Sequence, residues 1–178
     1  MVTLVLVSVM LVLAAPNVIA FQRNSELTTT ANSFLATLSA ARAEAMKRQL
    51  RTFVIPHDGN DWSSGWRAFV DVDGDVSPTA FSYEEGTDIL VSEAAGLAPS
   101  VAIDTSNGAT SFAHSGVKYA MFNGSGFMSL MGGGFPSGGA DSLDFHNGSE
   151  SRRVLASSAG RMRVCKPTDA GCSVSAGF

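Results

Sequence analysis

The sequence of 178 residues has little charge, little cysteine and no recognisable catalytic motif. Charged residues make up only 16% of it, and 12 basic residues against 16 acidic ones give a formal charge of −4. This balance excludes nucleic-acid binding over the whole surface and leaves only a local basic patch. Because 45% of the residues are hydrophobic, the chain is too apolar for a disordered protein. We predict one folded domain with an appendage.

Signatures of catalysis and of metal binding are equally scarce. No phosphate-binding loop, dinucleotide fingerprint or nucleophile elbow occurs, so we predict neither an enzyme nor a cofactor. Asp71, Asp73 and Asp75 alternate with turn residues, but the glycine and glutamate of an EF-hand loop do not occupy the required positions. We therefore predict a turn there and no metal site.

The two cysteines, Cys165 and Cys172, cannot form a cysteine-rich zinc site alone. They leave a single disulfide or two free thiols. The turn-rich residues between them favour a small disulfide loop, provided that the domain lies in an oxidising compartment.

Residues 1–22 contain no charged side chain and form a mostly apolar run. A helix rises about 1.5 Å per residue, so about twenty residues cross a hydrocarbon core of roughly 30 Å. We predict a transmembrane helix here, with a kink at Pro16, which lacks a backbone N–H. A cleaved signal peptide on a secreted domain is the alternative, but no basic residue precedes the apolar run.

Residues 23–51 have an amphipathic helical pattern with one apolar stripe. The stripe follows steps of three and four residues and comprises Leu27, Ala31, Phe34, Leu35, Leu38, Ala41 and Ala45, with the polar Gln49 at its end. Because neither glycine nor a further proline interrupts the pattern, we predict one helix over residues 1–51.

Residues 52–178 change to short β-type runs separated by turn-forming pairs such as Asp58-Gly59 and Asn147-Gly148. The expected strands cover 52–55, 66–70, 89–92, 101–103, 117–122, 127–131, 142–145, 153–156 and 161–165. A half-buried antiparallel sheet needs an apolar cover, and the stripe on the preceding helix supplies one. The predicted fold is α+β, with a long N-terminal helix packed on a C-terminal antiparallel β domain.

This arrangement resembles the superfamily of type IV pilins and type II secretion pseudopilins. Ala14-Ala15-Pro16 is similar to the segment with the helix-softening proline of that superfamily. The motifs within 32–48, 65–75 and 157–165 are similar to those of the GspH/FimT branch of minor pilins. The family also has a basic leader ending in glycine and a nearby glutamate, which do not precede Met1 here, so we expect either a misplaced start codon or a trimmed sequence.

The resemblance implies a minor pilin that primes assembly of a type IV pilus, or else a pseudopilin of a type II secretion system. The implied location is the bacterial inner membrane, with one membrane-spanning helix and a periplasmic β domain. The implied partners are membrane lipid before assembly and other major and minor pilins or pseudopilins afterwards, contacted through the N-terminal helix.

The C-terminal segment from Ser151 to Phe178 is locally basic, with five basic residues against one acidic residue. Some family members are understood to bind DNA through a Gly-Arg-x-Arg motif, which Gly160, Arg161 and Arg163 reproduce. Two arginines on one face of a strand can each bind a phosphate. The candidate DNA interface comprises Gly160, Arg161, Arg163, Lys166, Arg152 and Arg153. A solvated edge strand, a contact with a neighbouring pilin and a membrane-tethered DNA-binding module remain alternative interpretations.

Overall fold

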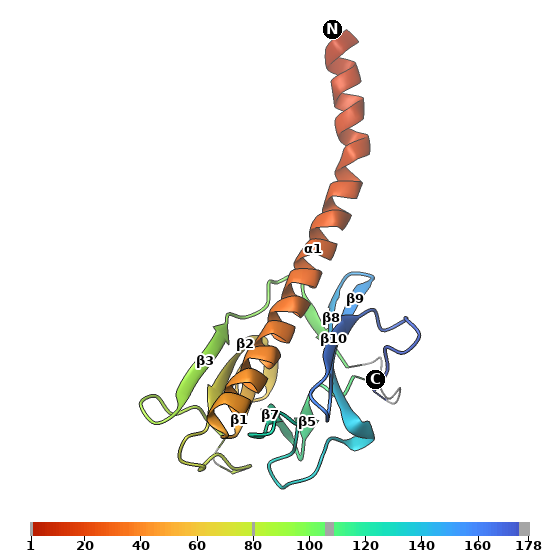
Figure 1. Cartoon of the computed structure of the whole chain (residues 1–178). Helices are drawn as coiled ribbons and strands as arrows, with labels where there is room; N and C mark the ends of the chain where they lie inside the picture. Colours follow the sequence, from red (N-terminus) through yellow and green to blue (C-terminus); the bar gives the residue numbers. More distant parts are fainter. Residues whose placement is uncertain (1, 80, 106–108, 175–178) are drawn as a thin grey trace.

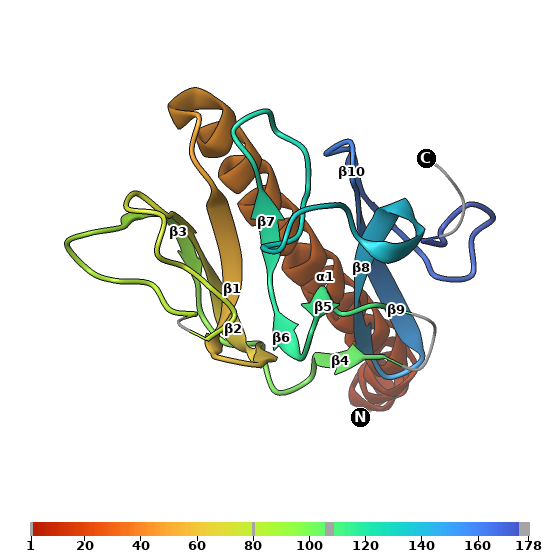
Figure 2. The same cartoon turned by 90° about the horizontal axis from the view of Figure 1, so that it is seen from below.

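A computed structural model describes residues 2–79, 81–105 and 109–174, with the side chains of residues 2–19 excluded. One helix precedes all of the strands (Figures 1 and 2). The elements are α1 (Val2–Arg48), β1 (Thr52–Asp58), β2 (Asp61–Val70), β3 (Ile89–Ala94), β4 (Ala102–Asp104), β5 (Ala113–His114), β6 (Val117–Lys118), β7 (Ala120–Phe122), a short 3-10 helix (Ser137–Gly139), β8 (Ala140–Asn147), β9 (Glu150–Ser157) and β10 (Met162–Cys165).

The helix α1 is continuous through Pro16, and its N-terminal part projects away from the sheets (Figure 1). It ends at Arg48, where Lys47 and Arg48 place positive charge in the last turn, next to the negative end of the helix dipole. Gln49 follows with a φ of 59°, which turns the chain out of the helix. The single long helix predicted from the sequence is confirmed.

The predicted stripe on α1 forms the centre of the main hydrophobic core. Six of its residues are fully buried: Leu27, Ala31, Phe34, Leu38, Ala41 and Ala45. Burying a large apolar side chain contributes about 1.5–3 kcal/mol. Among the described side chains of α1, those of residues 20–48, the first buried one is Leu27.

The strands form two four-stranded antiparallel sheets and a short two-stranded ribbon, whereas the sequence predicts a single sheet. The first sheet has the order β3-β2-β1-β7, the second has the order β10-β9-β8-β4, and β5 pairs with β6. The helix α1 contacts strands of both sheets, so it joins them into one domain (Figure 2). The predicted α+β class is confirmed.

The strand expected over 127–131 is wrong. Only Met128 takes part in an isolated bridge, with Phe122. Backbone N–H groups of this segment donate hydrogen bonds in two directions. Met128 N donates to Ser158 O, directly after β9, and Ser129 N donates to Met121 O in β7. Its hydrogen bonds therefore alternate between two partners and build no regular ladder.

A second, smaller core lies on the face of the first sheet opposite α1. It contains Phe53 and Ile55 of β1 with Phe69 of β2, and Phe81 and Tyr83 pack against it from the loop between β2 and β3. The loop is therefore held over this sheet by its own aromatic side chains.

Within the range whose side chains are described, no helical stretch is long and apolar enough to cross a membrane. The membrane segment expected over residues 1–22 falls almost wholly on residues 1–19, whose side chains are outside that range.

Candidate nucleic-acid interface

The Gly-Arg-x-Arg motif begins in the turn that joins β9 to β10 and ends in β10, which contains Arg163. The turn is closed by hydrogen bonds from Ser157 N to Arg161 O (2.8 Å) and from Gly160 N to Ser157 O (2.8 Å). Gly160 has a φ of 77°, in the left-handed region that favours glycine. A Cβ atom at Gly160 would lie 2.4 Å from Arg42 Nε and 2.5 Å from Gly126 O. The glycine of the motif therefore allows this turn to lie directly against α1.

Arg42 of α1 connects that turn to a neighbouring loop. Its Nε donates to Gly126 O at 2.9 Å. A side chain of the helix thus lies between the β9–β10 turn and the loop after β7, and it holds the motif at a defined position.

The two arginines of the motif follow the alternation of an extended chain. Met162 and Val164 pack against the main core, so Arg161 and Arg163 point away from it. Arg161 is exposed, whereas Arg163 is partly buried and donates through Nη2 to Gly171 O. Arg163 therefore also fixes the C-terminal loop.

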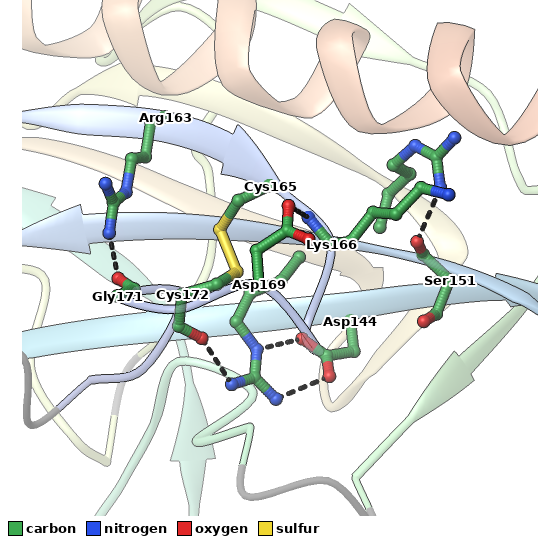
Figure 3. Close-up of a disulfide and its surroundings, with 10 residues drawn as sticks. Asp144, Ser151, Arg163, Cys165, Lys166, Asp169, Gly171 and Cys172 are labelled. Carbon is green, nitrogen blue, oxygen red and sulfur yellow. Dashed lines mark hydrogen bonds and ion pairs between the residues drawn. A yellow bond between two sulfur atoms is a disulfide. The ribbon is translucent and has the colours of Figure 1, made fainter.

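A disulfide closes that C-terminal loop, as expected (Figure 3). Cys165 and Cys172 are joined, with their Cα atoms 6.0 Å apart. Inside the loop, Asp169 N donates to Lys166 O at 2.9 Å, and Cys172 N donates to Asp169 O at 3.0 Å. Consecutive turns therefore bring the chain back over the outer face of the second sheet.

Arg153 lies under this loop and is buried, with 3% of its surface exposed. Its Nε and Nη2 donate to the two carboxylate oxygens of Asp144 at 2.6 and 2.7 Å (Figure 3). Its Nη1 donates to Cys172 O at 3.0 Å. The guanidinium thus joins β8, β9 and the disulfide loop, and it is not displayed to a phosphate.

Arg152 and Lys166 have different surroundings again. Arg152 Nη2 donates to Asn24 Oδ1 of α1 at 2.5 Å, and its Nη1 donates to Ser151 O at 2.8 Å. Lys166 is exposed and lies 3.4 Å from Glu150 Oε2. The structure therefore divides the six candidate residues into two groups. Gly160, Arg161, Arg163 and Lys166 lie in or beside β10 and its flanking turns, while Arg152 and Arg153 stabilise the domain.

A second group of charged residues emerges from the fold at the end of β2. One carboxylate oxygen from each of Asp71, Asp73 and Asp88 lies within 4.8 Å of the others. Sequence reasoning grouped Asp71 and Asp73 with Asp75 and missed Asp88, because Asp88 comes from the far end of the β2–β3 loop. Only the folding of that loop brings Asp88 to this position.

One long helix packed on two small antiparallel sheets defines a pilin-like protein, and solved structures show the same fold. The minor pilin FimU of the type IV pilus, from Pseudomonas aeruginosa, aligns with a TM-score of 0.57 and 17% identity, covering 86% of this chain and 98% of that one. The minor pseudopilin EpsH from the type 2 secretion system of Vibrio cholerae aligns with a TM-score of 0.51 and 16% identity, covering 81% of this chain and 99% of that one.

The chain belongs to the GspH family, described as type II transport protein GspH, which matches residues 30–169. The match includes the packed half of α1 and almost all of the β domain. No curated protein is similar enough in sequence to count as a relative. The resemblance to minor pilins and pseudopilins inferred from the sequence is confirmed.

Proposed function

We propose that this protein is a minor pilin of a type IV pilus that takes part in priming filament assembly. Before assembly, the N-terminal part of α1 is anchored in the bacterial inner membrane and the β domain lies in the periplasm. During assembly, the helix leaves the lipid and packs against the helices of other pilins. Neighbouring helices then replace the contacts that lipid provided.

The observation that carries this proposal is the exposure of α1 where it leaves the domain. All six side chains from Ala20 to Ser25 are exposed, and Phe21 exposes 73% of its surface. A helix that extends beyond its own domain needs another apolar partner to be stable. Packing among the helices of a filament supplies such a partner.

The disulfide of the C-terminal loop supports the periplasmic location of the β domain. Disulfides such as Cys165–Cys172 persist in oxidising compartments, including the bacterial periplasm, and are rare in the cytosol.

Replacing Phe21 by charged and apolar residues tests the helix contact. Phe21→Asp, made at the chromosomal gene, should leave the β domain folded, because an exposed side chain contributes within about 0.5 kcal/mol of stability. It should nevertheless lower the number of surface pili, counted by electron microscopy, to that of a strain lacking the gene. Phe21→Leu, which keeps the apolar surface, should retain the pili. Normal piliation with Phe21→Asp would contradict the proposal.

A pseudopilin of a type II secretion system is the second candidate. The description of the matching family and the structural likeness to EpsH support it. Deleting the gene distinguishes the two: loss of surface pili with normal secretion of folded exoproteins supports the pilus, and the reverse result supports the secretion system.

Binding of DNA is a finer part of the proposal, and it uses the exposed end of the Gly-Arg-x-Arg motif. Arg161 and Lys166 are exposed and Arg163 lies between them along the chain. Contacts with about three phosphates of duplex DNA predict a slope of about −3 for the logarithm of the binding constant against that of salt concentration. We expect weak binding without sequence preference, because contacts with phosphates carry no sequence information.

The test uses anisotropy of a labelled DNA duplex at several salt concentrations. Arg161→Gln should weaken binding and make the slope less steep by about 1. Arg48→Gln, which removes an arginine from the end of α1, is the matched control and should change neither quantity. Salt-insensitive binding, or equal weakening by both substitutions, would eliminate DNA binding through this motif.

A further inference from the structure

The loop between β2 and β3 is the most acidic part of the molecule. Residues 71–88 contain six acidic residues and no basic residue. The aromatic side chains of Phe81 and Tyr83 hold the loop against the second core, which fixes the positions of its two buried acids, Asp71 and Asp88. Charges held together in this way repel one another unless a cation lies among them.

Three carboxylates of this loop converge at one place. One oxygen each from Asp71, Asp73 and Asp88 lies within 4.8 Å of the others. Asp71 and Asp88 are 2% and 8% exposed, whereas Asp73 is exposed. The cluster is therefore half enclosed by protein, with one side open for a cation to enter.

Asp88 provides an independent sign of a missing ligand. Its Oδ2 accepts a hydrogen bond from Glu84 N at 3.0 Å, and the backbone N–H of Val72 also acts on this carboxyl, but its Oδ1 is buried and has no partner in hydrogen-bond geometry. A buried carboxylate oxygen without a partner costs free energy, because it has lost water and gained nothing in return. A bound cation is the partner that a carboxylate cluster of this kind suits.

The arginine at this site does not supply enough positive charge. Arg51 Nη2 donates to Asp71 Oδ2 at 2.6 Å and to Gly74 O at 2.8 Å. It brings one positive charge to three carboxylates. Each carboxylate oxygen of Asp71 also has a second lone pair, so the ion pair with Arg51 does not prevent Asp71 from binding a metal.

We propose that Asp71, Asp73 and Asp88 bind a calcium ion. Carboxylate oxygens are the ligands that hard divalent cations prefer, and calcium accepts oxygens at about 2.3–2.6 Å in flexible geometry. Two oxygens on opposite sides of one such ion are about 5 Å apart, which accommodates the spacing in the cluster. Water completes the coordination through the exposed side next to Asp73.

This site differs from the sequence expectation of a turn without metal. The EF-hand spacing fails at Asp71, Asp73 and Asp75, but the third ligand of the proposed site is Asp88, from outside that motif. Calcium would fasten the end of β2 to the residue before β3, and so fix both ends of the acidic loop. The site is independent of the type of filament to which the protein belongs.

The test measures calcium binding by the full chain in detergent, by calorimetric titration and by thermal unfolding in calcium chloride against EDTA. The unaltered chain should bind about one calcium ion, and saturating calcium should raise its Tm by about 5 °C. Asp88→Asn and Asp73→Asn should each raise the Kd for calcium by about tenfold or more. Asp73 is exposed, so its substitution remains informative even if Asp88→Asn fails to fold.

Glu85→Gln is the matched control, because Glu85 is an exposed acid of the same loop outside the cluster. It removes the same charge and should leave the Kd within about twofold of the original value. Absence of calcium binding by the unaltered chain would overturn the proposal. Equal weakening by Glu85→Gln and Asp73→Asn would also overturn it, since that result indicates diffuse attraction by the whole loop.

Discussion

Phe34 is the residue whose removal should damage the packing of α1 most. Its ring is fully buried and lies edge-on to four aromatic rings, at centroid distances of 5.3 Å to Trp62, 5.0 Å to Trp66, 5.7 Å to Phe112 and 5.9 Å to Phe145. Truncation of a buried phenylalanine to alanine costs about 3–5 kcal/mol. Loss of four aromatic contacts places Phe34→Ala near the upper end of that range. Domains of this size are stable by only about 5–15 kcal/mol.

The assay is urea unfolding of the full chain in detergent, followed by the fluorescence of the two tryptophans in contact with Phe34. Phe135→Ala is the control, because it removes the same ring from a side chain that is 57% exposed, and it should cost less than about 0.5 kcal/mol. A cost below about 1 kcal/mol for Phe34→Ala would refute the conclusion that this ring joins α1 to both sheets.

Four further predictions concern other parts of the domain. Asp144→Asn should destabilise the protein by about 3 kcal/mol in urea unfolding, because Arg153 keeps a buried charge without its counter-charge. Reducing the C-terminal disulfide should cost about 2 kcal/mol, given its sequence separation of 7, and should lower the Tm measured by circular dichroism. Gly160→Ala should lower the Tm, since the added Cβ meets Arg42 Nε. Burial raises the pKa of Asp88 above 3.8, so its protonated form stabilises the folded state. In urea titrations without calcium, the free energy of unfolding should therefore fall as the pH rises from 3.8 through the raised pKa, and Asp88→Asn should remove this dependence.

The helix could be predicted in detail because its pattern is local. The stripe from Leu27 to Ala45 depends only on neighbours three or four positions away, and burial agrees with it except at Leu35, which is partly buried. The division into two sheets could not be predicted in this way. It depends on pairings between distant segments, such as β1 with β7 and β4 with β8, for which a single sequence gives no signal.

In the candidate interface, contacts between side chains from distant segments could not be predicted from the sequence either. The sequence identifies a cluster of positive charges, but it does not show that Asp144 lies opposite Arg153 on the adjacent strand. Nor does it show that Arg152 reaches Asn24 on the helix. Charge counted along the chain therefore overestimates the charge available at the surface, because part of it is neutralised across the fold. Asp88 is the opposite case, a residue that acquires its neighbours only when the loop closes.

The contact of α1 with strands of both sheets has a mechanical consequence. A force along the helix axis shears the side-chain contacts between α1 and the strands. Many of these contacts must break at the same time before the helix separates from the domain. The load is then divided between two sheets whose strands form separate hydrogen-bonded sets, so a local failure in one does not release the helix from the other. Such a coupling suits the assembly step proposed above, in which the helix leaves the lipid while the β domain stays folded.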